Sequence, residues 1–180
     1  MMGMAFAEER RNDPKDDLMS ALVKAEIDGQ RLSDEEIASF FVLLSVAGND
    51  TTRNSISLTM KALLDFPDQK ELLLEDFEGR IPTAIEEFVR WVSPVMTFRR
   101  TATQDTELGG QQIRKGDWIA MIYSSGNRDE NVFESPEKFD ILREHNPHVG
   151  FGGGGPHFCL GNFVAKMQLR AIFDNLLHRA

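Results

Sequence analysis

The single cysteine of this 180-residue chain, Cys159, lies in a glycine-rich loop, and this placement constrains the fold more than any other feature. Glycines occupy positions 152–155 just before it, and Gly161 follows. Glycine loses more conformational freedom on folding than any other residue, so such a run indicates that bare backbone is needed there. One thiol cannot form an internal disulfide. We therefore predict that the loop, at the start of a helix, presents a thiolate to the metal of a large flat cofactor; the alternative is a small buried apolar side chain.

Length and composition indicate one ordinary globular domain, residues 1–180. The chain is 41% hydrophobic and 27% charged, and its net charge of −9 argues against a nucleic-acid-binding surface. No apolar stretch approaches the ~18 residues of a membrane span. The N-terminus lacks the apolar core of a signal peptide. We expect a cytoplasmic protein without a transmembrane segment.

Apolar spacing and capping residues predict helices over residues 14–25, 33–64, 67–74, 82–91 and 160–178. Asp13 before Pro14 is the expected cap of the first, and Ser33 with Glu36 forms a capping box for the second. The first half of the second helix is apolar on every side, which predicts burial. Two apolar faces on the last helix predict that it packs inside the domain.

Residues 97–123 have the pattern of strands, with a turn at Gly109–Gly110 and a buried strand over 118–123. Asp28–Gly29 marks another turn, and residues 127–147, rich in Asn, Asp and Pro, are expected to be irregular. The predicted fold class is mainly α with a small β-sheet.

Two further patterns carry chemistry. Gly48 to Thr52 interrupts the long apolar helix with polar residues, which suits a cavity more than a core; the alternative is a solvent-facing side. Within it, Asp50 and Thr51 set a carboxylate beside a hydroxyl, as proton delivery requires. Glu87 and Arg90 stand at i,i+3 on a helix and can pair, although such pairs are common on surfaces and contribute little there.

Two other patterns do not predict sites. Residues 150–155 satisfy Gly-x-Gly-x-x-Gly, but Asn146-Pro147-His148 precedes them where a dinucleotide fold has a strand, and Asp174 lies within a helix. We therefore do not expect nucleotide binding. His145, His148 and His178 have no ligand spacing with Cys159, so we do not expect a zinc site.

Together these segments resemble the cytochrome P450 family. The run Gly155 to Gly161 is similar to its haem-binding loop, Ala47 to Thr52 to the oxygen-activation motif of its central helix, and Glu87-x-x-Arg90 to its Glu-x-x-Arg motif. In one departure, Gly152 stands seven positions before the cysteine, where the family usually has an aromatic residue, and Phe151 stands eight before. We interpret this shift as a subgroup trait.

The resemblance implies a partial cytochrome P450 fold, its C-terminal haem-binding half, with the N-terminal half absent. It implies haem b, with Cys159 as thiolate ligand of the iron and Phe151, Gly155 and Gly161 in the cofactor-binding loop. It further assigns residues to three groups: the haem propionate partners Arg100 and His157, with Arg99 as the alternative to Arg100; the proton relay Asp50 and Thr51; and the structural network Glu87, Arg90 and Arg143.

The activity implied is that of a soluble bacterial monooxygenase, which inserts one oxygen atom from O2 into a lipophilic substrate such as a sterol side chain or a methyl-branched lipid. The expected partner is a ferredoxin-type electron donor. The alternative is a truncated, non-catalytic remnant. A haem-thiolate isomerase or peroxygenase is disfavoured, because that chemistry does not need the Asp50–Thr51 pair.

Overall fold

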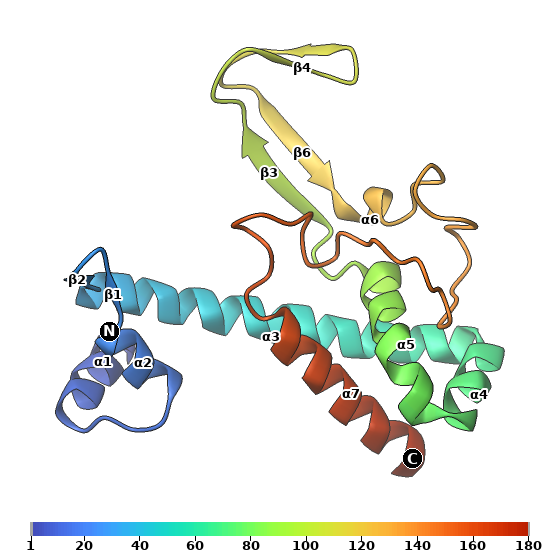
Figure 1. The fold of residues 1–180 in the computed structure, drawn as a ribbon, viewed down its shortest axis with the longest axis horizontal. Coiled ribbons are helices and arrows are strands. Elements are labelled where there is room, and N and C mark those ends of the chain that lie inside the picture. The colour runs from blue at the N-terminus through green and yellow to red at the C-terminus, as the bar shows by residue number, and fades with distance from the viewer. Residues whose placement is uncertain (1, 180) are drawn as a thin grey trace. The chain divides into compact units, whose positions relative to one another are not determined.

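The computed structural model describes residues 2–179 (Figure 1). Helices and strands follow one another in this order: α1 Met2–Asn12, α2 Leu18–Lys24, β1 Glu26–Ile27, β2 Gln30–Arg31, α3 Asp34–Asp65, α4 Pro67–Glu75, α5 Phe77–Val92, β3 Thr97–Thr101, β4 Thr106–Leu108, β5 Gln111–Ile113, β6 Trp118–Ile122, α6 Tyr123–Gly126 and α7 Asn162–Arg179. The mainly helical fold class is confirmed. None of the helices between residues 2 and 179 is both long and apolar enough to cross a membrane.

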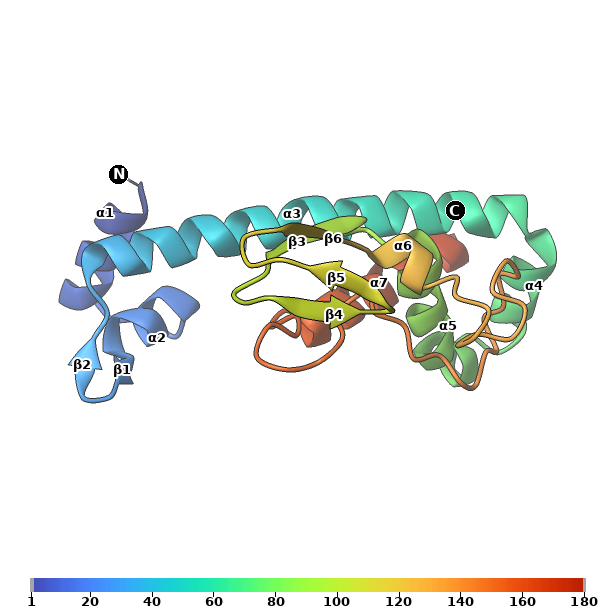
Figure 2. The ribbon, with the colours of Figure 1, turned by 90° about the horizontal axis from the view of Figure 1, so that it is seen from above.

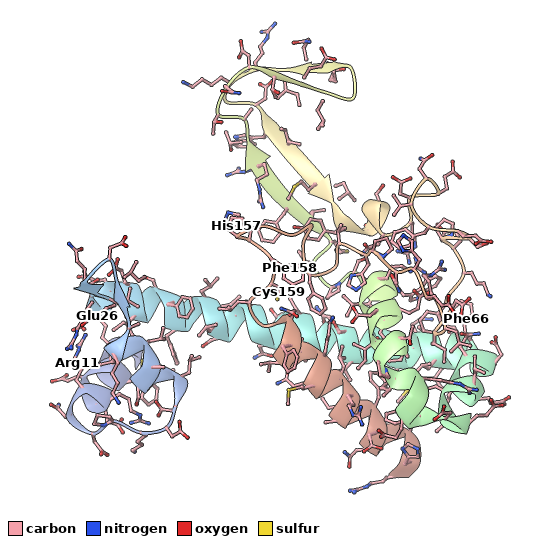
Figure 3. The ribbon with its side chains drawn as sticks, in the orientation of Figure 1. Arg11, Glu26, Phe66, His157, Phe158 and Cys159 are labelled. Atoms are coloured by element: carbon pink, nitrogen blue, oxygen red, sulfur yellow. The ribbon has the colours of Figure 1, made fainter. Side chains whose placement is uncertain are left out.

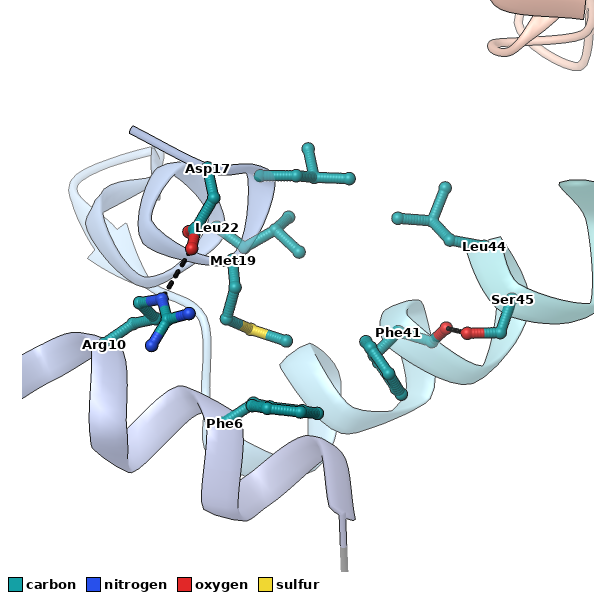
Figure 4. A pocket seen from close by; sticks show the side chains of 9 residues that line it. Phe6, Arg10, Asp17, Met19, Leu22, Phe41, Leu44 and Ser45 are labelled. Atoms are coloured by element: carbon teal, nitrogen blue, oxygen red, sulfur yellow. Dashed lines mark hydrogen bonds and ion pairs between the residues drawn. The ribbon is translucent and has the colours of Figure 1, made fainter. Parts of the chain in front are cut away.

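The chain divides into two compact units, one ending at Asp50 and the other beginning at Thr51. In the first unit, α1 packs against the start of α3, where any side chain at Gly3 would meet the Ala38 backbone at 3.0 Å. The Phe6 and Phe41 rings lie 5.9 Å apart. Figure 4 shows an apolar pocket beside them, lined mainly by Phe6, Met19, Leu22, Phe41 and Leu44.

Capping fixes where the helices of the first unit begin. The predicted capping box of α3 is confirmed: Ser33 N–H donates to the Glu36 carboxylate at 2.8 Å, and Glu36 N–H donates to Ser33 Oγ at 3.3 Å. The predicted start of a helix at Pro14 is wrong. Asp17 is the cap, because its carboxylate accepts from Ser20 N–H at 2.8 Å, and Asp13 instead continues the end of α1. Helix α1 itself was not predicted.

The core of the second unit lies between the second half of α3, α4, α5 and α7. Phe88 and Val89 of α5 contact Leu169 and Phe173 of α7, and Leu63 and Leu73 complete the cluster from α3 and α4. Helix α5 begins at Phe77, five residues before the predicted start at Pro82, because Asp76 caps it. Gly79 accepts no side chain there, since an added Cβ would stand 2.2 Å from the Asp76 carboxylate.

Three two-stranded antiparallel sheets hold the strands, which Figure 2 shows from above. The turn at Gly109–Gly110 is confirmed between β4 and β5, with φ of +57° and +80°, and Asp28–Gly29 joins β1 to β2 in the same way. The predicted strand over residues 118–123 is confirmed as β6, but its predicted burial is wrong. Among residues 2–179, β6 pairs only with β3, and Trp118 is 72% exposed, because no second layer of the described structure covers this ribbon.

Burial was also over-predicted for two helices. In α3, Val42, Leu43 and Val46 are about 60% exposed, because α1 and α2 cover only part of its circumference. In α7, Leu169 and Phe173 are buried as one face, while Val164 and Met167 of the other face are more than half exposed. An apolar side indicates a surface that needs cover, without specifying which element covers it.

The ion pair of Asp17 predicts a pH dependence for the first unit. Asp17 Oδ2 lies 2.5 Å from Arg10 Nε, and this bond together with Ser20 N–H lowers the pKa of Asp17 from 3.8 to about 2. Because the folded pKa is the lower one, the stabilisation is complete above about pH 4 and is lost as the pH falls toward 2. An NMR titration of the Asp17 carboxyl carbon measures this directly. Arg10→Gln should raise the Asp17 pKa toward 3.8; an unchanged midpoint would contradict the assignment.

Candidate functional site

The cysteine loop, residues 149–161, is closed by its own backbone. Gly152 N–H donates to the Val149 carbonyl at 2.8 Å, and Cys159 N–H donates to the Phe151 carbonyl at 2.9 Å. Figure 3 shows Cys159 just before α7, where Asn162 donates from its side chain to the Cys159 carbonyl at 2.7 Å. The loop therefore holds the thiol at the N-terminal end of the last helix, as predicted.

The glycines allow this path. Gly152, Gly154 and Gly155 have φ of +97°, +94° and +75°, a region that side-chain-bearing residues rarely adopt. Gly153 and Gly161 are not in that region, and an added Cβ on either would meet open space. Backbone conformation therefore explains the glycine at three positions, and the open space beside the loop leaves room for a bound group.

The residues next to Cys159 in the sequence carry apolar side chains that are exposed. Phe158 and Leu160 flank Cys159, and Phe163, Val164 and Met167 follow on the first turns of α7. All but Phe158 are more than half exposed. Exposed apolar area of this kind, in the residues next to one thiol, is typical of a surface that a hydrophobic ligand or another segment covers.

A pocket of about 410 Å³ lies between the loop and strand β3. Arg100 and His157 line it together with Gly152–Gly154 and the apolar side chains of Met121, Ile122 and Val149. Arg100 and Arg99 alternate in the strand, and the Arg99 guanidinium stacks 4.3 Å from the Trp118 ring centroid instead. Arg100, and not Arg99, therefore shares the pocket with His157.

These donors fit haem b. A pocket with one guanidinium and one imidazole matches a group that carries two carboxylates, and the apolar patch matches its ring. Between residues 2 and 179, no cluster of three or more His, Cys, Asp or Glu side chains could hold a metal ion. An axial thiolate, as in haem proteins, needs no such cluster.

Asp50 and Thr51 are consecutive residues of α3, the last of the first unit and the first of the second. The Thr51 carbonyl accepts from Ser55 Oγ at 2.8 Å, a bond typical of serine within a helix. A side chain at Gly48, one turn earlier, would meet no other atom within 4 Å. The predicted carboxylate and hydroxyl are thus neighbours on one helix, away in sequence from every loop residue named above.

The structure brings Glu87, Arg90 and Arg143 together in the second unit. Arg90 pairs with Glu87 through two bonds, Nε to Oε2 at 2.7 Å and Nη2 to Oε1 at 2.8 Å, and both side chains are fully buried. Arg143 Nε stands 3.3 Å from Glu87 Oε2. The remaining Arg90 donors bind the carbonyls of Asn127, Pro136 and Lys138. The pair therefore holds the irregular segment that leads to the cysteine loop.

Two further side chains, Asn127 and Glu86, bind residues at the ends of the cysteine loop, and the sequence did not predict either role. Asn127, fully buried, donates to Ser93 Oγ at 2.8 Å and accepts from Val149 N–H at 2.7 Å, where the loop begins. Glu86 accepts from His148 at 3.0 Å and from Lys166 at 2.6 Å. Burial raises the pKa of Glu86, but these two hydrogen bonds outweigh it and hold the pKa below its usual value. No local spacing could reveal either group, because their partners lie 22 to 80 residues away.

Three comparisons with known proteins, by family model, by curated relatives and by solved structures, all match this chain to cytochrome P450 or monooxygenase proteins. The cytochrome P450 family model matches residues 4–179. A methyl-branched lipid omega-hydroxylase of Mycobacterium tuberculosis is 55% identical over 172 residues, 96% of this chain and 40% of that protein. A steroid C26-monooxygenase of Rhodococcus jostii is 53% identical over 97% of this chain and 37% of that protein.

Solved structures agree. A Mycobacterium marinum cytochrome P450 in complex with pseudoionone is 62% identical, with a TM-score of 0.93 over 98% of this chain and 43% of that one. A substrate-free Bacillus megaterium cytochrome P450 gives a TM-score of 0.95 at 38% identity, over 99% of this chain and 46% of that one. The chain spans about two fifths of the length of the curated relatives it matches.

The buried pair predicts a large stability loss. Glu87→Ala leaves the Arg90 guanidinium buried without its carboxylate, which should cost about 3–5 kcal/mol in the free energy of unfolding. Urea denaturation followed by circular dichroism measures it. The control is Glu75→Ala, which removes an exposed partner of Arg80 and should cost about 0–1 kcal/mol. Equal losses in the two variants would contradict the role of Glu87.

Proposed function

The chain belongs to the cytochrome P450 family, and on that premise we propose that it is the haem-binding and oxygen-activating part of a haem-thiolate monooxygenase. Residues 1–180 would form one partial cytochrome P450 domain. One observation carries the proposal: the pocket beside the cysteine loop is lined by both Arg100 and His157, on apolar surroundings. Such a lining supports the binding of a flat dicarboxylate, and the loop that contributes His157 to the pocket also carries Cys159.

Each residue of this site has a distinct task. Cys159 would hold the iron through its sulfur. The Arg100 guanidinium and the His157 imidazole would bind the two propionates. Phe151 would belong to the haem-binding loop, and the glycines at 152–155 and Gly161 would leave room for the ring, because they carry no side chain. When bound, haem supplies the reductive activation of O2 that no side chain can perform.

Asp50 and Thr51 serve proton delivery. A monooxygenase consumes two protons and two electrons for each O2, giving one hydroxylated product and one water. The Asp50 carboxyl would take a proton from solvent and release it toward the Thr51 hydroxyl, which would pass it on to the bound oxygen. A side chain at Gly48, one turn earlier on α3, would meet no other atom within 4 Å.

The substrate proposed is a lipophilic molecule, a sterol side chain or a methyl-branched lipid. The names of two relatives, a methyl-branched lipid omega-hydroxylase and a steroid C26-monooxygenase, support this choice. Electrons would arrive one at a time from a ferredoxin-type donor fed by NAD(P)H. The alternative is a non-catalytic remnant that does not assemble a working haem site.

Carbon monoxide tests the thiolate site. The purified chain, loaded with haem, reduced and exposed to carbon monoxide, should show the strongly red-shifted Soret band of thiolate ligation. Cys159→Ser should abolish the band, while Ser124→Ala, a hydroxyl outside the pocket lining, should keep it. A band at the position of free or histidine-ligated haem in the unaltered chain would contradict the proposal and favour the remnant.

Thr51→Ala tests the proton relay. With haem, NADH, a ferredoxin and its reductase, and a methyl-branched fatty acid, the variant should consume NADH while forming several-fold less hydroxylated product, because proton delivery fails. The control is Thr52→Ala, which removes a neighbouring hydroxyl of the same helix to which the proposal assigns no task. Product per NADH is the measured quantity. Unchanged coupling in Thr51→Ala would remove the relay, and no product from the unaltered chain would favour the remnant.

A further inference from the structure

Glu86 stands beside the motif residue Glu87, yet it serves a different part of the molecule. Consecutive residues of a helix point about 100° apart. Glu87 faces Arg90 and Arg143, whereas the half-buried carboxylate of Glu86 faces His148 and Lys166. His148 precedes the cysteine loop and Lys166 follows it in α7, seven residues after Cys159. One carboxylate on α5 therefore contacts both flanks of the loop.

The first flank is fixed through an oriented imidazole. Gly150 N–H donates to His148 Nδ1 at 3.1 Å, so Nδ1 is the acceptor and the ring proton resides on Nε2. That Nε2–H donates to Glu86 Oε2 at 3.0 Å. The His148 side chain is only 5% exposed, so water has little access to its ring nitrogens. A continuous chain of hydrogen bonds thus joins Glu86 to the Gly150 backbone.

The second flank is fixed by a cation that also touches the loop. Lys166 Nζ stands 2.6 Å from Glu86 Oε1 and 5.3 Å from the centroid of the Phe151 ring. The His148 ring approaches the same aromatic ring, with centroids 5.9 Å apart. Phe151 is the residue whose carbonyl accepts the Cys159 N–H. Both groups bound to Glu86 therefore also contact the residue on which the cysteine backbone rests.

Packing leaves little freedom at the point where the first flank meets α5. A Cβ added at Gly150 would stand 2.5 Å from Val89 Cγ1 and 3.1 Å from the Val89 carbonyl. The loop entry is thus in close contact with α5 one turn from Glu86. Gly150 N–H also donates to His148 Nδ1, so moving the loop entry away from α5 breaks that hydrogen bond.

We propose that Glu86 is a positioning residue that joins the two flanks of the cysteine loop, through His148 and Lys166, and so fixes where the Cys159 thiol stands. The positioning role of Glu86 does not depend on the proposed function. Only the identity of the group that the thiol binds rests on it. A matched comparison exists in the same two helices. Glu78 of α5 pairs with Arg170 of α7, but that pair is exposed and touches no loop residue, so we assign it no such role.

Amide hydrogen exchange of the haem-free chain tests the inference without any cofactor. Glu86→Ala should speed exchange at Gly150, Gly152 and Cys159 by about tenfold, since it removes two charge-assisted hydrogen bonds. Glu86→Gln keeps an acceptor for His148 but not the charge for Lys166, so it should restore part of the protection at Gly150. Glu78→Ala is the control and should leave all three amides unchanged.

Two results would overturn the role of Glu86: unchanged exchange at the three amides in Glu86→Ala, or an equal acceleration at the core amides of Leu169 and Phe173, which reports general destabilisation. A second readout is spectroscopic. The haem-loaded, carbon monoxide-bound Glu86→Ala chain should lose part of its thiolate band, and Glu78→Ala should keep it. The unaltered chain's own band tests the proposed function, so failure of that function and failure of this inference give different results.

Discussion

The buried pair of Arg90 and Glu87 is the interaction on which the rest of the site depends. All five N–H donors of the Arg90 guanidinium are used, two on Glu87 and three on carbonyls of the segment between α6 and α7. That segment has no regular secondary structure, and the three hydrogen bonds that its own carbonyls accept from Arg90 fix its path. Burying a charge is costly, and here the cost is offset because its partners are complete. The result is a coil whose end, the cysteine loop, begins at a fixed point.

Several parts of this arrangement could be predicted from the sequence because they are local. The capping box of α3, the Gly109–Gly110 turn and the i,i+3 spacing of Glu87 and Arg90 all act within a few residues. Burial could not be predicted in the same way. The apolar sides of α3, β6 and α7 indicate surfaces that require cover, and within residues 2–179 much of that surface stays exposed. Asn127, Glu86 and His148 were missed because their partners are brought near only by the tertiary fold.

The ligand that we propose for the pocket follows from the different chemical groups found at the cysteine loop. A guanidinium from strand β3 and an imidazole from the cysteine loop line one pocket with apolar side chains, and the same loop carries the thiol of Cys159. We propose that this set binds a flat ligand with a metal at its centre and anionic groups at its edge. The proposed proton relay, the acid and hydroxyl of α3, belongs to a different element, so substitutions can test ligand binding and proton delivery independently.

The central claim is that the sulfur of Cys159 is the protein ligand of the iron. Iron K-edge X-ray absorption on the haem-loaded chain tests this most directly, with Cys159→Ser as the comparison. The account predicts one sulfur neighbour of the iron in the unaltered chain and none in the variant. A first shell of nitrogen and oxygen only in the unaltered chain would contradict it. So would a sulfur neighbour that persists in the variant, since a thioether from one of the eight methionines would then be the ligand.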